Sequence, residues 1–226
     1  MNKTDIRDAA TVILLRDKST EPRILMGQRG HAAAFMPNKF VFPGGALDRT
    51  DTGVPLASGM AEPNMSRLRM AANPELAEPL ILAAIREIWE ETGLLLGKPD
   101  DSARALADKV PAGWRSFFQH GVLPSGEGMK FVFRAVTPPG RPRRFDARFF
   151  LVDTERVASD LDNFDQACDE LSHLQWIPLA EARSFDLPFI TEVALAEVEA
   201  DLKNPARNAR VPYFFNADGR SNFSRL

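Results

Sequence analysis

Three glutamates, Glu87, Glu90 and Glu91, crowd the segment AIREIWEETG at residues 84–93. On a helix they fall at positions i, i+3 and i+4 and share one face. Like charges at such spacings cost about 0.2–0.5 kcal/mol per pair even in water. Arg86 can pair with Glu90, but one arginine cannot neutralise three carboxylates. Several carboxylates without a neighbouring Cys or His favour a hard cation, Mg²⁺ or Mn²⁺. A solvated acidic face without a ligand is the alternative.

A helix must position these glutamates, and the sequence predicts one from Pro79 to about Leu95. Pro79 suits the first turn of a helix, and Gly93 stands where a helix ends. The side of this helix opposite to the glutamates is apolar, so we expect it to pack on a sheet. Its residues are Ile81, Ala84, Ile85 and Ile88.

The spacing of this segment resembles the Nudix box, the signature of the Nudix hydrolase family, which reads G-x5-E-x7-R-E-U-x-E-E-x-G-U with U aliphatic. Glu78 is followed by seven residues and then by REIWEETGL, residues 86–94, which matches every specified position. The resemblance implies a metal-dependent hydrolase whose three helical glutamates hold the metal ion. It implies catalytic parts for Glu87, Glu91 and Arg86, with the arginine orienting the carboxylates.

The glycine of the box is displaced. Six residues before Glu78 the chain has Ala72, whereas the Pro-Gly-Gly that leads into the box stands at residues 43–45. We therefore expect residues 46–77, called the insertion below, to extend the loop before the catalytic helix. Such an extension costs little, because the entropy of loop closure grows only logarithmically with length.

Two flanking segments, residues 26–48 and 137–150, resemble the Nudix 19-like branch of coenzyme A diphosphatases. That branch would cleave CoA or acyl-CoA to 3′,5′-ADP and (acyl-)4′-phosphopantetheine. A pyrophosphatase of ADP-ribose, NADH or another nucleoside diphosphate derivative is the alternative, because the box does not set substrate choice. A non-enzymatic Nudix domain that senses a nucleotide is a further alternative, which the intact carboxylates disfavour.

Candidate substrate contacts lie outside the helix. Arginines suit phosphate groups, and glycines let the backbone approach a ligand closely. A solvated basic loop is the alternative for the arginines of residues 141–148. The candidates for substrate binding are Arg29, Gly44, Gly45, Arg143 and Arg144, with Arg141 and Arg148 in the same basic stretch.

The base that activates water stays open. Glu87 is one candidate, and Glu170, just before an expected strand, is another, with a plain surface glutamate as its alternative. Asp146 is a third polar candidate. Three aromatic residues near the glycines would either stack on an adenine or belong to the core. They are Phe35, Phe40 and Phe42.

Composition sets the outer limits. The 226 residues are 44% hydrophobic and 26% charged, with a net charge of -3, so nothing points to nucleic acid or to a membrane. The single cysteine, Cys168, fits a reducing compartment and a buried, inert thiol. We expect a cytoplasmic protein, or a peroxisomal one if the source is eukaryotic, from the terminal Ser-Arg-Leu. Expected partners are a small nucleotide substrate and a second copy of the chain.

The pattern of the whole chain predicts an α/β fold, and the resemblance implies a single Nudix domain, 1–226, built as an α/β/α sandwich with a mixed β-sheet. We expect the C-terminal segment 211–225 to dock on a sheet edge or a second subunit. Strands are predicted at 10–16, 24–29, 129–138 and 147–152, and a strand leading into a helix is predicted at 171–182. A further strand is predicted at 40–45 and ends in a Pro-Gly-Gly break. Helices are predicted at 66–72, within 102–119 and at 190–202.

Overall fold

The computed structural model of this chain describes residues 5–33, 35–204, 210–217 and 220–226. The strands are β1 (Ile6–Arg16), β2 (Arg23–Arg29), β3 (Phe40–Val41), β4 (Gly44–Ala46), β5 (Gly97–Pro99), β6 (Val122–Pro124), β7 (Lys130–Val136), β8 (Arg144–Asp153), β9 (Leu171–Pro178), β10 (Pro212–Ala217) and β11 (Arg220–Arg225). The α-helices are α1 (Asn64–Arg69), α2 (Ala77–Thr92), α3 (Ala103–Leu106), α4 (Arg115–Gln119) and α5 (Phe189–Lys203). Short 3-10 helices are η1 (Arg49–Asp51), η2 (Pro74–Leu76), η3 (Ala112–Trp114), η4 (Thr154–Arg156) and η5 (Ala182–Ser184).

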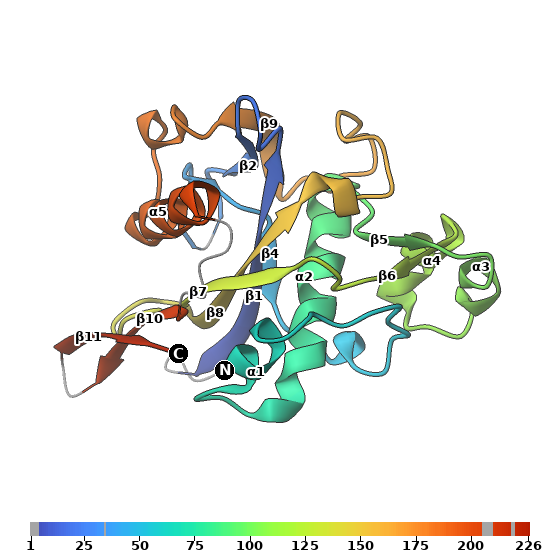
Figure 1. The fold of residues 1–226 in the computed structure, drawn as a ribbon, viewed down its shortest axis with the longest axis horizontal. Coiled ribbons are helices and arrows are strands. Elements are labelled where there is room, and N and C mark those ends of the chain that lie inside the picture. Colours follow the sequence, from blue (N-terminus) through green and yellow to red (C-terminus); the bar gives the residue numbers. More distant parts are fainter. Residues whose placement is uncertain (1–4, 34, 205–209, 218–219) are drawn as a thin grey trace.

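One mixed sheet carries the fold. Its strand order is β11-β10-β7-β8-β1-β2-β3, with β4 beside β1 and β9 beside β2. The pairs β1–β8 and β7–β10 are parallel, and the other pairs are antiparallel. Helix α2 lies on one side of the sheet and α5 on the other (Figure 1). The predicted α/β/α sandwich with a mixed sheet is therefore confirmed.

Strand β1 lies at the centre of both cores. Val12 and Leu14 face the cluster that contains α2, whereas Ile13 and Leu15 face the cluster that contains α5. Successive side chains of a strand point to opposite faces, so a strand covered on both sides reads as a continuous apolar run. The run ATVILLR that predicted this strand has that character.

The strand expected at residues 40–45 does break at the Pro-Gly-Gly segment, but the chain forms a second strand directly after Pro43. Pro43 has no N–H to donate, and β3 ends before it while β4 begins after it. The carbonyl of Pro43 accepts from the Val12 N–H, and β4 then pairs with β1. Strand β3 instead pairs with β2. The break turns Gly44 and Gly45 toward α2, where the candidate site lies.

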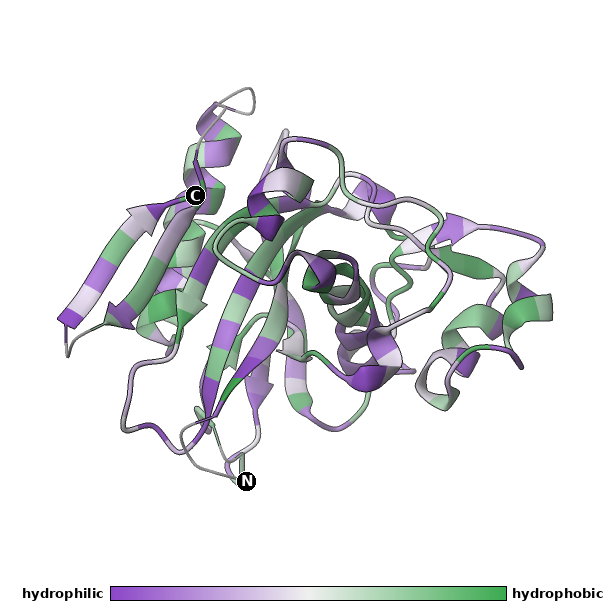
Figure 2. Cartoon of the chain, turned by 90° about the horizontal axis from the view of Figure 1, so that it is seen from below, coloured by the Kyte–Doolittle hydropathy of each residue, from purple (hydrophilic) through white to green (hydrophobic). Residues whose placement is uncertain are grey.

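Helix α2 begins and ends earlier than the predicted 79–95. Asn73 caps the preceding turn η2, which runs directly into α2 at Ala77. The helix ends at Thr92 because Gly93 adopts a left-handed conformation with φ of 74° and donates its N–H to the Trp89 carbonyl. The apolar face predicted for this helix is buried in the core cluster that also contains Val12 and Leu14 of β1. In Figure 2 the central helix carries green, hydrophobic residues.

The insertion is packed rather than loose. Val54, Met60 and Leu68 are buried in the same core cluster as α2. The Asn64 side chain accepts from the Phe131 backbone at 3.1 Å, which ties the insertion to β7. The short helix expected at 66–72 is α1, which begins two residues earlier and ends three residues earlier. The helical pieces expected within 102–119 are α3, η3 and α4.

The C-terminal hairpin extends the sheet. Strand β10 pairs in parallel with β7, and β11 forms the outer strand beside it (Figure 1). Of the two docking positions predicted for this segment, the sheet edge is the one observed. The predicted helix 190–202 is α5, and the strand expected from residue 171 is β9, followed by the short turn η5. In the described part of the chain, no helix is long and apolar enough to cross a membrane.

Candidate active site

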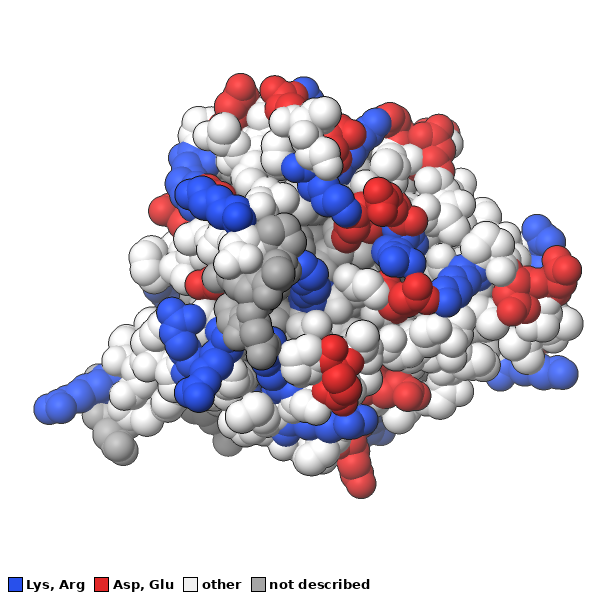
Figure 3. Space-filling view, in the orientation of Figure 1, with Lys and Arg blue, Asp and Glu red and all other residues white. Residues whose placement is uncertain are grey.

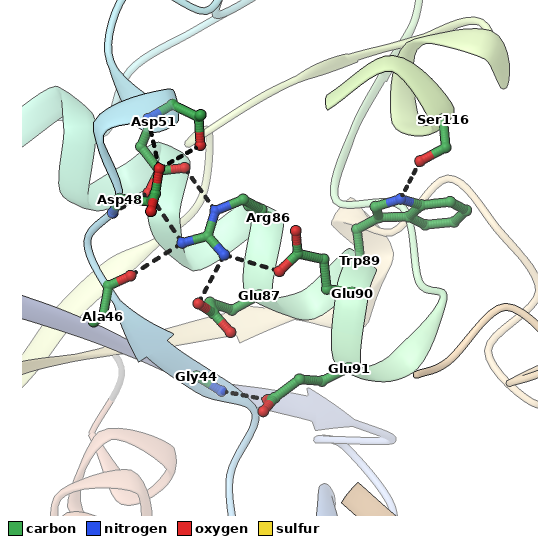
Figure 4. A network of polar contacts seen from close by, with 11 residues as sticks. Gly44, Ala46, Asp48, Asp51, Arg86, Glu87, Trp89, Glu90, Glu91 and Ser116 are labelled. Carbon is green, nitrogen blue, oxygen red and sulfur yellow. Dashed lines mark hydrogen bonds and ion pairs between the residues drawn. The ribbon is translucent and has the colours of Figure 1, made fainter. Parts of the chain in front are cut away.

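Two glutamates of α2, Glu87 and Glu91, face the glycines of β4. The Gly44 N–H donates to a Glu91 carboxylate oxygen at 2.7 Å (Figure 4). A Cβ atom on Gly45 would lie 2.3 Å from Glu87 Oε1, so a side chain there would displace that carboxylate. Glu91 is only 1% exposed, whereas the side chain of Glu90 is 40% exposed. The structure thus brings Gly44 and Gly45 together with two of the candidate glutamates, Glu91 and Glu87.

Arg86 holds two of these glutamates in place. Its Nη1 donates to Glu87 Oε1 at 2.8 Å and to Glu90 Oε2 at 2.9 Å. The predicted pairing of Arg86 with Glu90 is therefore confirmed. Its Nη2 also donates to the Ala46 carbonyl, and the edge formed by Nε and Nη2 binds Asp51. These five hydrogen bonds use the full donor capacity of a guanidinium group.

Asp51 is a site residue that the sequence interpretation missed. It is fully buried, and its two carboxylate oxygens accept from Arg86 at 2.8 and 3.0 Å. The Asp48 N–H also donates to it at 2.9 Å, within the capping box of η1. The signal that could have found Asp51 is its distance from Gly45, five intervening residues. Glu78, the glutamate assigned to the box from spacing, is exposed on the first turn of α2.

Burial disfavours the negative charges of the glutamates at this site. Burial raises the pKa of Glu87 to about 7, although Arg86 acts in the opposite direction. Burial also raises the pKa of Glu91 well above its usual value, and the neighbouring Glu87 adds to the effect. Glu170 raises the pKa of both residues, so its carboxylate lies within electrostatic reach of them. A cation placed among these carboxylates would relieve their repulsion.

The donor set fits a hard divalent cation. Carboxylate oxygens at a helix with no imidazole or thiolate among them are the ligands that Mg²⁺ and Mn²⁺ prefer. In the described residues, no three acidic, His or Cys side chains are gathered into a metal-holding group with their present rotamers. Glu87 and Glu90 instead have one oxygen each on Arg86. Their remaining oxygens and the carboxylate of Glu91 are the groups that would hold a metal ion.

Arg29 and Glu170 border the same site. Arg29 Nη2 donates to Glu170 Oε1 at 2.9 Å, and the charge of Arg29 acts on Glu91. The Nε of Arg29 is buried without a hydrogen-bond partner, which leaves a donor for an oxygen atom of a ligand. The structure therefore brings both of these candidates to the glutamates of α2.

The arginines of the β7–β8 turn lie in other environments. Arg144 donates to the Thr137 carbonyl across the turn, and Arg141 and Arg143 are exposed. Arg148 belongs to no solvated loop, because it is buried on β8 and paired with Asp8 and Asp146. Neither Arg143 nor Arg144 has a recorded hydrogen bond or ion pair with the α2 glutamates in the described part of the chain.

Asp146 also forms two hydrogen bonds with Arg134, at 2.9 and 2.6 Å. Arg134 in turn donates to the carbonyls of Met70 and Ala71 in the insertion. The guanidinium of Arg134 lies 4.4 Å from the centre of the Tyr213 ring, on β10. This buried network joins the insertion, the sheet and the C-terminal hairpin, and it gives Asp146 a structural role.

Two further expectations are decided by burial. The prediction of a buried thiol is wrong, because Cys168 is exposed in the loop before β9, where its N–H donates to the Glu90 carbonyl at 2.8 Å. Phe42 is buried in the core, and Phe40 packs against Phe185 with ring centres 4.8 Å apart. Phe35 is half-buried against Phe145.

Known proteins share this architecture. No family model matches the chain. Putative Nudix hydrolase 7 of Caenorhabditis elegans is 29% identical over 180 residues, which cover 76% of this chain and 51% of that protein. A NUDIX hydrolase from Alicyclobacillus acidocaldarius has a TM-score of 0.61 at 25% identity, covering 89% of this chain and 97% of that one. The NUDIX domain of Shewanella oneidensis NrtR, solved with ADP-ribose, has a TM-score of 0.50 at 11% identity, covering 88% and 90%.

These similarities define the fold class of the protein. The chain has the Nudix fold, an α/β/α sandwich around a mixed sheet. The sequence relative and the Alicyclobacillus structure, both Nudix hydrolases by name, add similarity of sequence to this similarity of fold. The chain spans about half the length of the C. elegans relative.

Proposed function

We propose that this protein is a metal-dependent hydrolase that cleaves the diphosphate linkage of a nucleotide derivative. The observation that carries this proposal is the arrangement around Arg86. One arginine holds Glu87 and Glu90 at 2.8 and 2.9 Å, while Gly44 holds Glu91 at 2.7 Å. Buried carboxylates held in this way suit a cation and, through it, an anionic diphosphate that they would otherwise repel.

The chain's own residues have distinct parts in this proposal. Glu87, Glu90 and Glu91 would hold Mg²⁺ or Mn²⁺, which supplies charge neutralisation and Lewis acidity to the diphosphate oxygens when bound. Arg86 orients the carboxylates. Arg29, whose Nε is buried without a hydrogen-bond partner, would donate to an oxygen of the substrate. Either Glu87 or Glu170 would take the proton of the attacking water.

CoA or acyl-CoA is the proposed substrate, with 3′,5′-ADP and (acyl-)4′-phosphopantetheine as products. The sequence resemblance of residues 26–48 and 137–150 to coenzyme A diphosphatases supports it. Arg143 and Arg144 would then meet a phosphate group from the exposed β7–β8 turn. Hydrolysis of ADP-ribose, NADH or another nucleoside diphosphate derivative is the second candidate. A nucleotide sensor without activity is the third, and the three retained glutamates count against it.

The deciding experiment is a product assay. Purified protein with Mg²⁺ or Mn²⁺ is incubated with CoA, acetyl-CoA, NADH, ADP-ribose and nucleotide sugars, and products are separated by chromatography. Release of 3′,5′-ADP supports the CoA substrate, whereas release of AMP supports the second candidate. If folded, metal-loaded protein turns over no compound, the hydrolase is refuted. Ligand binding that persists without hydrolysis, unchanged in Glu90→Gln and Glu91→Gln, would instead establish the sensor.

We extend the proposal to partners and location. Positive and negative side chains are intermingled over the face seen in Figure 3, which suits a protein that binds a small ligand rather than a nucleic acid. A cytoplasmic protein that acts on a small nucleotide, as a monomer or a homodimer, is the simplest arrangement. Size-exclusion chromatography with light scattering measures the oligomeric state.

A further inference from the structure

We infer that Asp51, and not Glu78, is the acidic residue that positions Arg86 in the site. The inference rests on the proposed function and concerns how its carboxylates are held. It also moves the beginning of the inserted residues from Ala46 to Thr52.

Both halves of the box pattern can be counted from their fixed ends. Counting forward from Gly45, five residues, 46–50, precede Asp51, which satisfies the interval between the glycine and the first acid. Counting backward from Arg86, seven residues precede it after Glu78, which satisfies the second interval. The two acids are different residues, so sequence spacing alone supports two assignments and the structure must choose between them.

Helix geometry removes Glu78 from this role. Both Glu78 and Arg86 lie within the continuous helix α2, eight residues apart. Eight residues rise by about 12 Å and turn by about 80° beyond two full turns, so the two side chains point in different directions from distant turns. Glu78 is exposed in the first turn of α2, where its negative charge interacts favourably with the positive end of the helix dipole.

Asp51 has the position that Glu78 lacks. It is fully buried, and both of its oxygens bind the Nε and Nη2 edge of Arg86, a two-point contact that sets the plane of the guanidinium group. With that edge fixed, Nη1 can point only at Glu87 and Glu90. The turn η1, which carries Asp51, is itself held by its N-cap residue Asp48 through a capping box. Asp51 is thus a positioning residue that acts through Arg86.

The experiment compares Asp51→Asn with Glu78→Gln, which removes the same charge at the competing position, and with Asp51→Glu as the conservative variant. The first readout is the Nε–H signal of Arg86 in the NMR spectrum, assigned by its loss in Arg86→Lys. The second is Mn²⁺ affinity by electron paramagnetic resonance. Asp51→Asn should shift or broaden the signal and weaken Mn²⁺ binding about 10–100-fold, as loss of a group behind a metal ligand does. Glu78→Gln should leave both unchanged, and Asp51→Glu should restore part of each.

The inference is overturned if Glu78→Gln moves the signal or weakens Mn²⁺ binding while Asp51→Asn does neither. If Asp51→Asn does not fold by circular dichroism, Asp51→Glu and Glu78→Gln decide: only the former should shift the Arg86 signal. Failure of the proposed function looks different. The native chain would then hydrolyse nothing, while the NMR signal would still separate the Asp51 variants from Glu78→Gln.

Discussion

At the residue scale, Glu91 shows the sharpest conflict between charge and burial. It is almost completely buried, accepts a hydrogen bond from the Gly44 backbone N–H, and lies near the carboxylate of Glu87. A chain selected for stability alone would place a neutral side chain here, because burying a second negative charge is unfavourable. Residues kept against stability are typical of functional sites.

We therefore expect Glu91→Gln to separate activity from stability. Loss of one carboxylate should lower kcat by about 10²-fold or more, since a charged donor to the metal is lost. The free energy of unfolding should stay equal or rise, because the repulsion with Glu87 is relieved. Steady-state kinetics and urea denaturation measure the two effects. Activity near that of the native protein would remove Glu91 from the proposed ligand set.

For the pair Arg134 and Asp146 we expect the opposite effect, a loss of stability when the charge is removed. Their side chains are buried and joined by two hydrogen bonds, with Arg148 alongside. Asp146→Asn should destabilise the protein by about 3–5 kcal/mol, because it leaves buried arginine charge without its partner. Urea denaturation measures this loss. The control is Glu199→Gln, which breaks the exposed pair with Arg183 and should cost about 0–1 kcal/mol. Equal losses in the two variants would contradict this account.

Residue-scale sequence reasoning succeeded where partners are local. The shared face of the glutamates and the pairing of Arg86 with Glu90 follow from helix spacing alone. Asp51, Asp8 and Asp146 meet their arginines through contacts between elements, and no local pattern contains that information. The burial of Arg148 and the exposure of Cys168 were not predicted for the same reason. Residue type gives only a tendency toward burial or exposure, whereas packing between elements decides which of the two a side chain has.

At the element scale, the insertion behaves as part of the core. Its helix α1 buries Leu68 against α2, while Met70, just past the end of α1, is exposed. Sequence favoured a loop here because the segment has many Pro, Gly and Asn residues and no clear period. The few apolar residues between them were enough to anchor it.

Leu68→Ala should therefore destabilise the protein by about 2–5 kcal/mol through the cavity that it leaves. Thermal or urea unfolding of the whole chain measures this change. The matched control, Met70→Ala, removes an exposed side chain of similar size and should change the free energy of unfolding by no more than about 0.5 kcal/mol. If both variants unfold like the native protein, the insertion is not coupled to the core.

Element limits were harder to predict than element types. The strands β1, β2, β7, β8 and β9 and the helices α2 and α5 were all expected from period and composition. The Pro-Gly-Gly break was expected, but the strand β4 beyond Pro43 was missed, because it depends on β1 having one edge that serves two partners, β4 and β2. The extension of β8 back to Arg144 depends on β1 beside it, since polar residues at its start gave no strand signal.

At the scale of the whole molecule, a bound cation should stabilise the fold. A metal ion that binds only the native state raises the free energy of unfolding by about 2.7 kcal/mol at a concentration 100 times its Kd. Mg²⁺ or Mn²⁺ should therefore raise Tm in a scanning fluorimetry or calorimetry titration, and EDTA should reverse the rise. Glu91→Gln should show a smaller rise. An unchanged Tm in the native protein at saturating metal would contradict a site among these carboxylates.

The layered architecture was predictable because the apolar patterns of its strands and helices add up over many residues. The choice of sheet edge for the C-terminal hairpin was not, since aromatic and basic residues suit an edge strand and a subunit contact equally. Tyr213 shows what decided it: its ring covers the buried Arg134 guanidinium, a contact available only beside β7.

The parallel pairing of β1 with β8 also sets an order of events during protein synthesis. Residues Ile6–Leu15 pair with Arg144–Asp153, so β1 leaves the ribosome well before its longest partner, β8, exists. Until then its apolar run depends for cover on elements made earlier, such as β2, β4 and α2. A nascent chain with such a strand exposes aggregation-prone surface and depends on early hairpin contacts or a chaperone to shield it.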